Sequence, residues 1–170
     1  MNAKKAVRLA LAHKTIIPAF NIPYLPMVEP VTQAIADENS VAMVQVARLE
    51  WEKFESESPD AVAKEYFKFQ KPGYTLLHLD HVPAIDEDQK EVDFLPLLQR
   101  ALDAGYQSVM VDGSRLPLEE NIAVTAKTAA LAAKYNAGVE AELGAVAGHE
   151  GSGIGLSYEE LFTSKKGFTK

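Results

Sequence analysis

The chain has 170 residues, of which 47% are hydrophobic and 24% are charged, which fits one globular domain or part of a larger one and excludes a disordered or low-complexity protein. Seventeen Lys and Arg face 24 Asp and Glu, so the net charge of −7 gives no electrostatic case for binding nucleic acid or an anionic membrane. The absence of cysteine excludes disulfides, thiolate metal sites and a cysteine nucleophile. We expect a cytoplasmic protein, because no apolar run reaches the roughly 18 residues that a membrane span needs.

Strand-like and helix-like segments alternate along the chain after an N-terminal helix over Met1–Lys14. Strands are expected near 15–20, 41–46, 74–79, 107–111 and 139–143. Helices are expected near 25–38, 59–71, 93–104 and 117–135, with a long polar loop over 47–58. A glycine-rich loop follows over 144–155, and a short helical turn is expected over 158–162.

The expected strands recur at intervals of 26 to 33 residues, which is a strand–helix repeat of nearly constant length. They are short and apolar on both faces, as strands of a helix-covered parallel sheet are. A doubly wound sheet and a (βα)8 barrel both fit this pattern. No glycine-rich nucleotide motif follows any strand, so a nucleotide-binding fold has little support.

Polar side chains follow four of these strands: Asn21, then Asp80 and His81, then Asp112, then Glu142. In a barrel all strand ends converge on one mouth, where catalysis takes place, so this distribution favours the TIM (βα)8 barrel. Only about five of the eight units fit into the sequence. We therefore interpret residues 1–170 as the N-terminal portion of a single TIM-barrel domain.

The densest chemistry lies in the segment His78-Leu79-Asp80-His81. Imidazole is a good ligand for Zn²⁺, and a neighbouring carboxylate can carry protons to and from a substrate oxygen. A structural interpretation stays open, in which His78 is a buried, hydrogen-bonded histidine and Asp80 caps a turn. Asp112, which precedes Gly113-Ser114, has the same alternative as a turn residue.

Three motifs together resemble the class II, zinc-dependent ketose-bisphosphate aldolases, which act on fructose or tagatose bisphosphate. They are Leu77-His78-Leu79-Asp80-His81, then the run from Ser108 through Asp112-Gly113-Ser114 to Ile122, and Val139-Glu140-Ala141-Glu142-Leu143-Gly144. The segment Ala19-Phe20-Asn21 resembles the family's motif at the first strand. The motifs keep the family's order, and each lies at an expected strand end.

The resemblance implies a role for each matching residue. His81 is the first of three histidines on a catalytic Zn²⁺, while Asp112 and Glu142 hold a second divalent or monovalent cation or support the first. Asp80 is the acid/base at the substrate hydroxyl, and Glu150 is the loop carboxylate that removes a proton from the three-carbon ketone phosphate. Asn21 and Ser114 bind the substrate.

The implied reaction is reversible cleavage of a ketose 1,6-bisphosphate to dihydroxyacetone phosphate and glyceraldehyde 3-phosphate, an aldehyde-lyase step of carbohydrate metabolism, as in glycolysis, by a homo-oligomer, dimer or tetramer. Ala47 departs from the family's phosphate-binding serine, and Arg115 replaces a histidine, which puts the substrate in doubt. Because only one of the three zinc histidines is present, we expect the 170-residue chain alone to be inactive. Two alternatives remain: an inactive half-barrel that acts as a structural or interaction module, and a related metal-dependent sugar-phosphate lyase.

Overall fold

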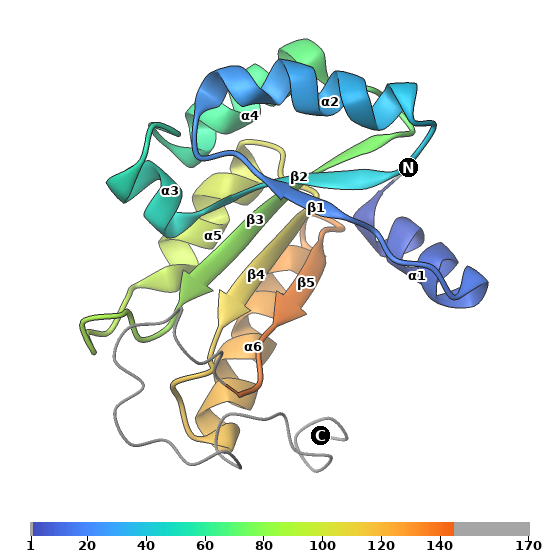
Figure 1. The fold of residues 1–170 in the computed structure, drawn as a ribbon. Coiled ribbons are helices and arrows are strands. Elements are labelled where there is room, and N and C mark those ends of the chain that lie inside the picture. The colour runs from blue at the N-terminus through green and yellow to red at the C-terminus, as the bar shows by residue number, and fades with distance from the viewer. Residues whose placement is uncertain (1, 145–170) are drawn as a thin grey trace.

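The structure is a computed structural model, and it describes residues 2–144 (Figure 1). Five parallel strands form one sheet in the order β1-β2-β3-β4-β5. The strands are β1 (Ala19–Asn21), β2 (Ala42–Ala47), β3 (Thr75–Pro83), β4 (Ser108–Asp112) and β5 (Gly138–Ala141). The helices are α1 (Ala3–His13), η1 (Leu25–Met27), α2 (Val28–Asp37), α3 (Arg48–Lys53), α4 (Pro59–Phe69), α5 (Phe94–Asp103) and α6 (Leu118–Ala133).

One face of the sheet carries the hydrophobic core. Alternate residues of each strand point to opposite faces, so Val44, Leu77 and Val109 share the face that packs against the helices. From the helices come Val28 and Ile35 of α2, Val62 and Tyr66 of α4, Leu98 and Leu102 of α5, and Leu131 of α6. The intervening strand residues form a second face that mixes polar side chains, such as Gln45, Asp80 and Asp112, with apolar ones, such as Leu76 and Met110.

The strand order distinguishes the two architectures that the sequence left open. Each strand pairs with its sequence neighbour in parallel, from Ala19 against Met43 to Val109 against Val139. A doubly wound sheet reverses its strand order at a switch point, whereas a barrel adds each strand beside the previous one. The described residues therefore have the topology of the first five βα units of a (βα)8 barrel. That residues 1–170 are part of one barrel domain stays a prediction.

Strand β3 is longer than predicted, and this changes where the key motif lies. The prediction ended the strand at residue 79, with His81 just beyond it, but β3 continues to Pro83. The pairing with β4 shifts register between Leu79 and Val82, and His81 has a positive φ of 38°. Bulges of this kind redirect side chains and are common beside active sites. Asp80 and His81 thus lie within the strand, at its irregularity.

Two further segments differ from the prediction. The first strand is Ala19–Asn21 rather than 15–20, because within residues 2–144 it pairs only with residues 43–45 of β2. The segment 47–58, predicted as a loop, contains α3. The carboxylate of Glu50 accepts the Ala47 backbone N–H at 2.7 Å, and Arg48 pairs with Glu52 one turn later at 2.8 Å. Both contacts stabilise a short helix that composition alone does not reveal.

The other helices agree with the sequence to within a few residues. Asn2 begins α1 by accepting the Lys5 N–H, and Ser58 begins α4 by accepting the Ala61 N–H, as N-cap residues do. Among residues 2–144, no helix is long and apolar enough to cross a membrane.

Candidate active site

His81, Asp112 and Glu142 meet at the carboxyl ends of β3, β4 and β5. His81 Nδ1 lies 3.7 Å from Asp112 Oδ2 and 3.6 Å from Glu142 Oε2. One nitrogen or oxygen of each residue lies within 4.8 Å of the other two. An imidazole and two carboxylates at this spacing form a donor set that suits Zn²⁺ or another divalent cation. This group is called the carboxylate–histidine cluster below.

Local hydrogen bonds hold the Asp112 carboxylate and the backbone of Glu142 in place. Asp112 Oδ1 accepts the Ser114 backbone N–H at 2.8 Å, which leaves Oδ2 on the side of His81. The Asn121 side chain donates to the Glu142 carbonyl oxygen at 2.7 Å and so fixes the chain just after β5. Gly113 allows this, because a Cβ there would lie 2.6 Å from Oδ1 of Asn121. Bonds of this kind around metal ligands orient them.

The electrostatics of the cluster favour a positive charge. Interaction with the Asp112 carboxylate, only partly opposed by burial, raises the pKa of His81 to about 9, and Asp80 and Glu142 add to the effect. Burial would raise the pKa of Asp112, but interactions with His81 and Ser114 lower it below its usual value. The negative charge that holds a proton on the imidazole above neutral pH also attracts a metal cation. The cation would replace that proton, since ligands must be deprotonated to bind.

Asp80 lies beside the cluster in a separate hydrogen-bond network. Its Oδ2 accepts from the side-chain nitrogen of Gln45 at 2.8 Å and from that of Asn21 at 3.1 Å. Gln45 also donates to Asn21 Oδ1 at 2.9 Å, so the three side chains fix one another. One oxygen of this buried carboxylate is thereby held by two amides, which orients the whole group toward the strand ends.

The network continues to Glu50 on α3. Glu50 Oε2 accepts from Asn21 Nδ2 at 3.2 Å as well as from the Ala47 N–H. Burial raises the pKa of Glu50, with hydrogen bonds from Ala47 and Asn21 acting against it and the nearby Asp80 carboxylate adding to it. The sequence did not single out Gln45 or Glu50. Gln45 could have been found from the alternation of side chains along β2. Glu50 could not, because it lies on α3, a helix that was predicted as a loop.

A pocket of about 620 Å³ lies at the strand ends. Asn21, Asp80, His81 and Asp112 border it, as do Glu50 and Arg115. Its apolar wall includes Leu49, Phe54 and Ile85. A concave site with a few convergent polar groups is the usual form of a small-molecule site.

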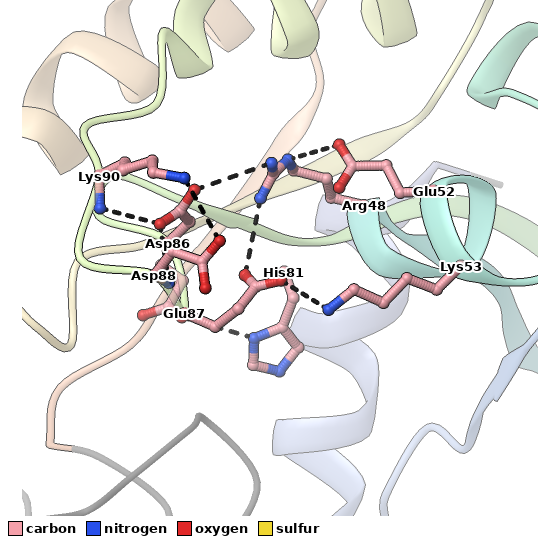
Figure 2. A network of polar contacts seen from close by, with 9 residues as sticks. Arg48, Glu52, Lys53, His81, Asp86, Glu87, Asp88 and Lys90 are labelled. Carbon is pink, nitrogen blue, oxygen red and sulfur yellow. Dashed lines mark hydrogen bonds and ion pairs between the residues drawn. The ribbon is translucent and has the colours of Figure 1, made fainter.

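Ion pairs tie α3 to the loop after β3 along one rim of this pocket (Figure 2). Arg48 lies 3.8 Å from Glu87 and 4.0 Å from Asp86, and Lys53 lies 2.9 Å from Glu87. Asp86 also accepts the backbone N–H groups of Asp88 and Lys90, so the loop carries its own turn. Ion pairs therefore connect α3 to this loop, and the cations Arg48 and Lys53 on the rim are paired with carboxylates.

The structure brings most of the predicted site residues together. Asn21, Asp80, His81 and Asp112 border one pocket, and Glu142 joins them through His81. Ser114 contributes its backbone N–H to Asp112 and is not among the residues that line the pocket. Glu150 lies outside the described residues. His78 is buried and its Nδ1 lies 2.8 Å from Ser108 Oγ, in agreement with the structural interpretation of that residue.

The described residues have the fold of the first five units of a (βα)8 barrel, and sequence comparison gives the family. The profile described as "Fructose-bisphosphate aldolase class-II" matches residues 1–170, so the chain belongs to that family. The recognition made from the motifs is confirmed. The fold in Figure 1 is similar to that of solved aldolases. The fructose-bisphosphate aldolase from Campylobacter jejuni superposes with a TM-score of 0.65 at 20% identity, covering 84% of this chain and 46% of that one.

Two curated relatives illustrate the range of activities. A 6-phospho-5-dehydro-2-deoxy-D-gluconate aldolase of Bacillus licheniformis is 31% identical over 166 residues, covering 95% of this chain and 53% of that protein. A D-tagatose-1,6-bisphosphate aldolase subunit GatY of Klebsiella oxytoca is 33% identical over 146 residues, covering 86% of this chain and 46% of that protein. The chain thus spans about half the length of these relatives.

Proposed function

We propose that the chain forms the metal-binding and acid/base part of the active site of a class II aldolase that cleaves a phosphorylated ketose. The observation that carries this proposal is the juxtaposition of two groups at one mouth. The ligand atoms of His81, Asp112 and Glu142 lie within 4.8 Å of one another, and the oriented carboxylate of Asp80 adjoins them. The family and the order of the motifs along the chain support the same assignment.

In this proposal His81 would hold a divalent cation, Zn²⁺ by resemblance, with Asp112 and Glu142 in support, and the bound cation would supply Lewis-acid polarisation of a ketone carbonyl. Asp80 takes the proton of the hydroxyl group at the carbon next to the bond that breaks and returns it in the reverse direction. Asn21 and Gln45 keep that carboxylate aimed at the hydroxyl. Glu150 remains the proposed base at the three-carbon ketone phosphate.

The substrate proposal starts from what the names of the two relatives share. Both name a sugar derivative with at least one phosphate, and they differ at the second end, which is a phosphate in the bisphosphate and a carboxylate in the gluconate. We therefore propose that the substrate of this chain is a phosphorylated ketose, because a phosphorylated sugar derivative is what the two names share. The ketose 1,6-bisphosphate that the motifs imply stays a prediction about the second end, as does a homo-oligomeric assembly.

The test is aldol cleavage by the chain co-expressed with the C-terminal half of the Bacillus licheniformis relative, with Zn²⁺ and a coupled assay for triose phosphate. We expect turnover that the Asp80→Asn variant loses while keeping its metal. A chain that takes up no divalent cation at stoichiometric occupancy would contradict the proposal and favour the structural-module alternative. Turnover by the chain alone would instead show that a second copy supplies the missing ligands.

A further inference from the structure

Arg48 of α3 lines the pocket and forms ion pairs with carboxylates, while its buried Nη1 makes no hydrogen bond among the described residues. Arg48 Nε lies 2.8 Å from Glu52, and its two terminal nitrogens lie 3.8 Å from Glu87 and 4.0 Å from Asp86. Lys53 pairs with Glu87 at 2.9 Å. Three carboxylates, those of Glu52, Asp86 and Glu87, therefore surround the Arg48 guanidinium (Figure 2), and a phosphate group that approaches Arg48 would be repelled by them.

The backbone at the end of β2 is equally closed to a phosphate. Residue 47 is alanine, which has no hydroxyl to donate. Its backbone N–H already donates to the Glu50 carboxylate at 2.7 Å. An oxyanion at this point would have to displace a carboxylate of the protein itself, and it would then lie beside that carboxylate and that of Asp80.

The pocket wall formed by the ends of β2 and β3 and by α3 is well equipped to bind hydroxyl groups. Glu50 and Asp80 present carboxylate oxygens that are bridged by Asn21 Nδ2, at 3.2 Å and 3.1 Å. Carboxylates accept hydrogen bonds from hydroxyl groups, and side-chain amides both donate to them and accept from them. A hydroxyl group carries no charge, so the carboxylates do not repel it. The apolar side chains of Leu49, Phe54 and Ile85 border the same pocket and suit a carbon skeleton.

Resting on the proposed function for the choice of pocket, we infer that this subsite binds the end of the sugar that carries hydroxyl groups and no phosphate. The substrate class is then a ketose 1-phosphate with an unphosphorylated polyhydroxyl end, rather than a ketose 1,6-bisphosphate. Glu50 is the specificity-determining residue, because its fixed carboxylate accepts from a sugar hydroxyl and repels a phosphate.

The test uses the 170-residue chain, treated with a chelator, and two probes that differ only in a phosphate: erythritol and erythritol 4-phosphate. Each is titrated into ¹⁵N-labelled protein while the Ala47 backbone amide and the side-chain amides of Asn21 and Gln45 are followed. We expect erythritol to bind at least about tenfold more tightly than its phosphate. Because no metal or turnover is needed, failure of the proposed function would leave this comparison intact.

Two variants locate the discrimination. Glu50→Gln keeps an acceptor but removes the charge, so the preference for erythritol is expected to fall below about threefold. Arg115→Gln removes another cation that lines the pocket but forms no ion pair with Glu50 among the described contacts, and the preference is expected to stay as in the parent chain. Unchanged backbone resonances away from the pocket confirm that each variant is folded. Tighter binding of the phosphate by the parent chain, absence of saturable shifts with erythritol, or an unaltered preference in Glu50→Gln would each overturn the inference.

Discussion

The two halves of the pocket are built from the same kind of position, a strand end, yet they differ in charge and in bonding. The half formed by β3, β4 and the end of β5 gathers His81, Asp112 and Glu142 at ion-pair distances. The half formed by β1, β2 and α3 links Asn21 and Gln45 through neutral amide hydrogen bonds. We propose that the first half holds a cation and that the second binds hydroxyl groups. Neighbouring strands at one barrel mouth can therefore bind different chemical groups.

The largest expected effect separates the two halves by their metal affinity. His81→Ala should lower the affinity of the chain for Zn²⁺ or Co²⁺ by about 100-fold or more, since changes around metal ligands alone cost about 10–100-fold. Gln45→Leu, in the other half, should leave that affinity unchanged. Titration with Co²⁺ followed by visible absorption measures both. Equal losses in the two variants would erase the distinction.

A second effect concerns Asp80, which joins the halves. In the active complemented protein, Asp80→Asn should reduce kcat by about 10²-fold or more, as expected when an acid/base group is lost. Its metal content should stay at the level of the parent, because Asp80 is bonded to the amides of Asn21 and Gln45. Steady-state kinetics together with metal analysis decides the point, and unchanged turnover would exclude Asp80 from proton transfer.

A third effect tests how the cluster half is supported. Gly113→Ala should destabilise the fold by about 1–3 kcal/mol, the usual cost of overpacking. The new Cβ would lie 2.6 Å from the Asn121 side chain, which holds the Glu142 carbonyl oxygen. Urea unfolding measures the loss. In Asn121→Ala the same change at Gly113 should cost clearly less, and additive effects would rule out this clash as the cause.

The smallest effect is the dependence of stability on pH in the metal-free protein. The pKa of His81 is raised from 6.5 to about 9 in the folded state. Its contribution is therefore fully present below its unfolded pKa of about 6.5 and is lost as the pH rises through about 9. The difference in unfolding free energy between the parent and His81→Gln should thus shrink from about pH 6 to about pH 10. A difference that grows over this interval would contradict the ion pairs seen here.

The contrast between the halves also shows what the sequence could reveal. The repeat of strands and helices and the polar residues near each strand end predicted the barrel topology and the proximity of His81 and Asp112 to neighbouring strand ends, because short-range patterns encode both. The bulge in β3 could not be predicted, since it depends on pairing with β4 rather than on local composition. Glu50 was missed for a different reason: α3 begins after Ala47, which is not one of the Ser, Thr, Asp or Asn residues that usually mark a helix start.

The most direct test of the central claim, that His81, Asp112 and Glu142 hold a divalent cation, is a crystal structure of the protein soaked in Zn²⁺ with anomalous diffraction data. We expect a strong anomalous peak at the carboxyl ends of β3–β5, about 2.0–2.2 Å from a nitrogen of His81 and an oxygen of at least one of the two carboxylates. A fully occupied Zn²⁺ elsewhere, with His81 still paired to Asp112 and no peak between them, would contradict it.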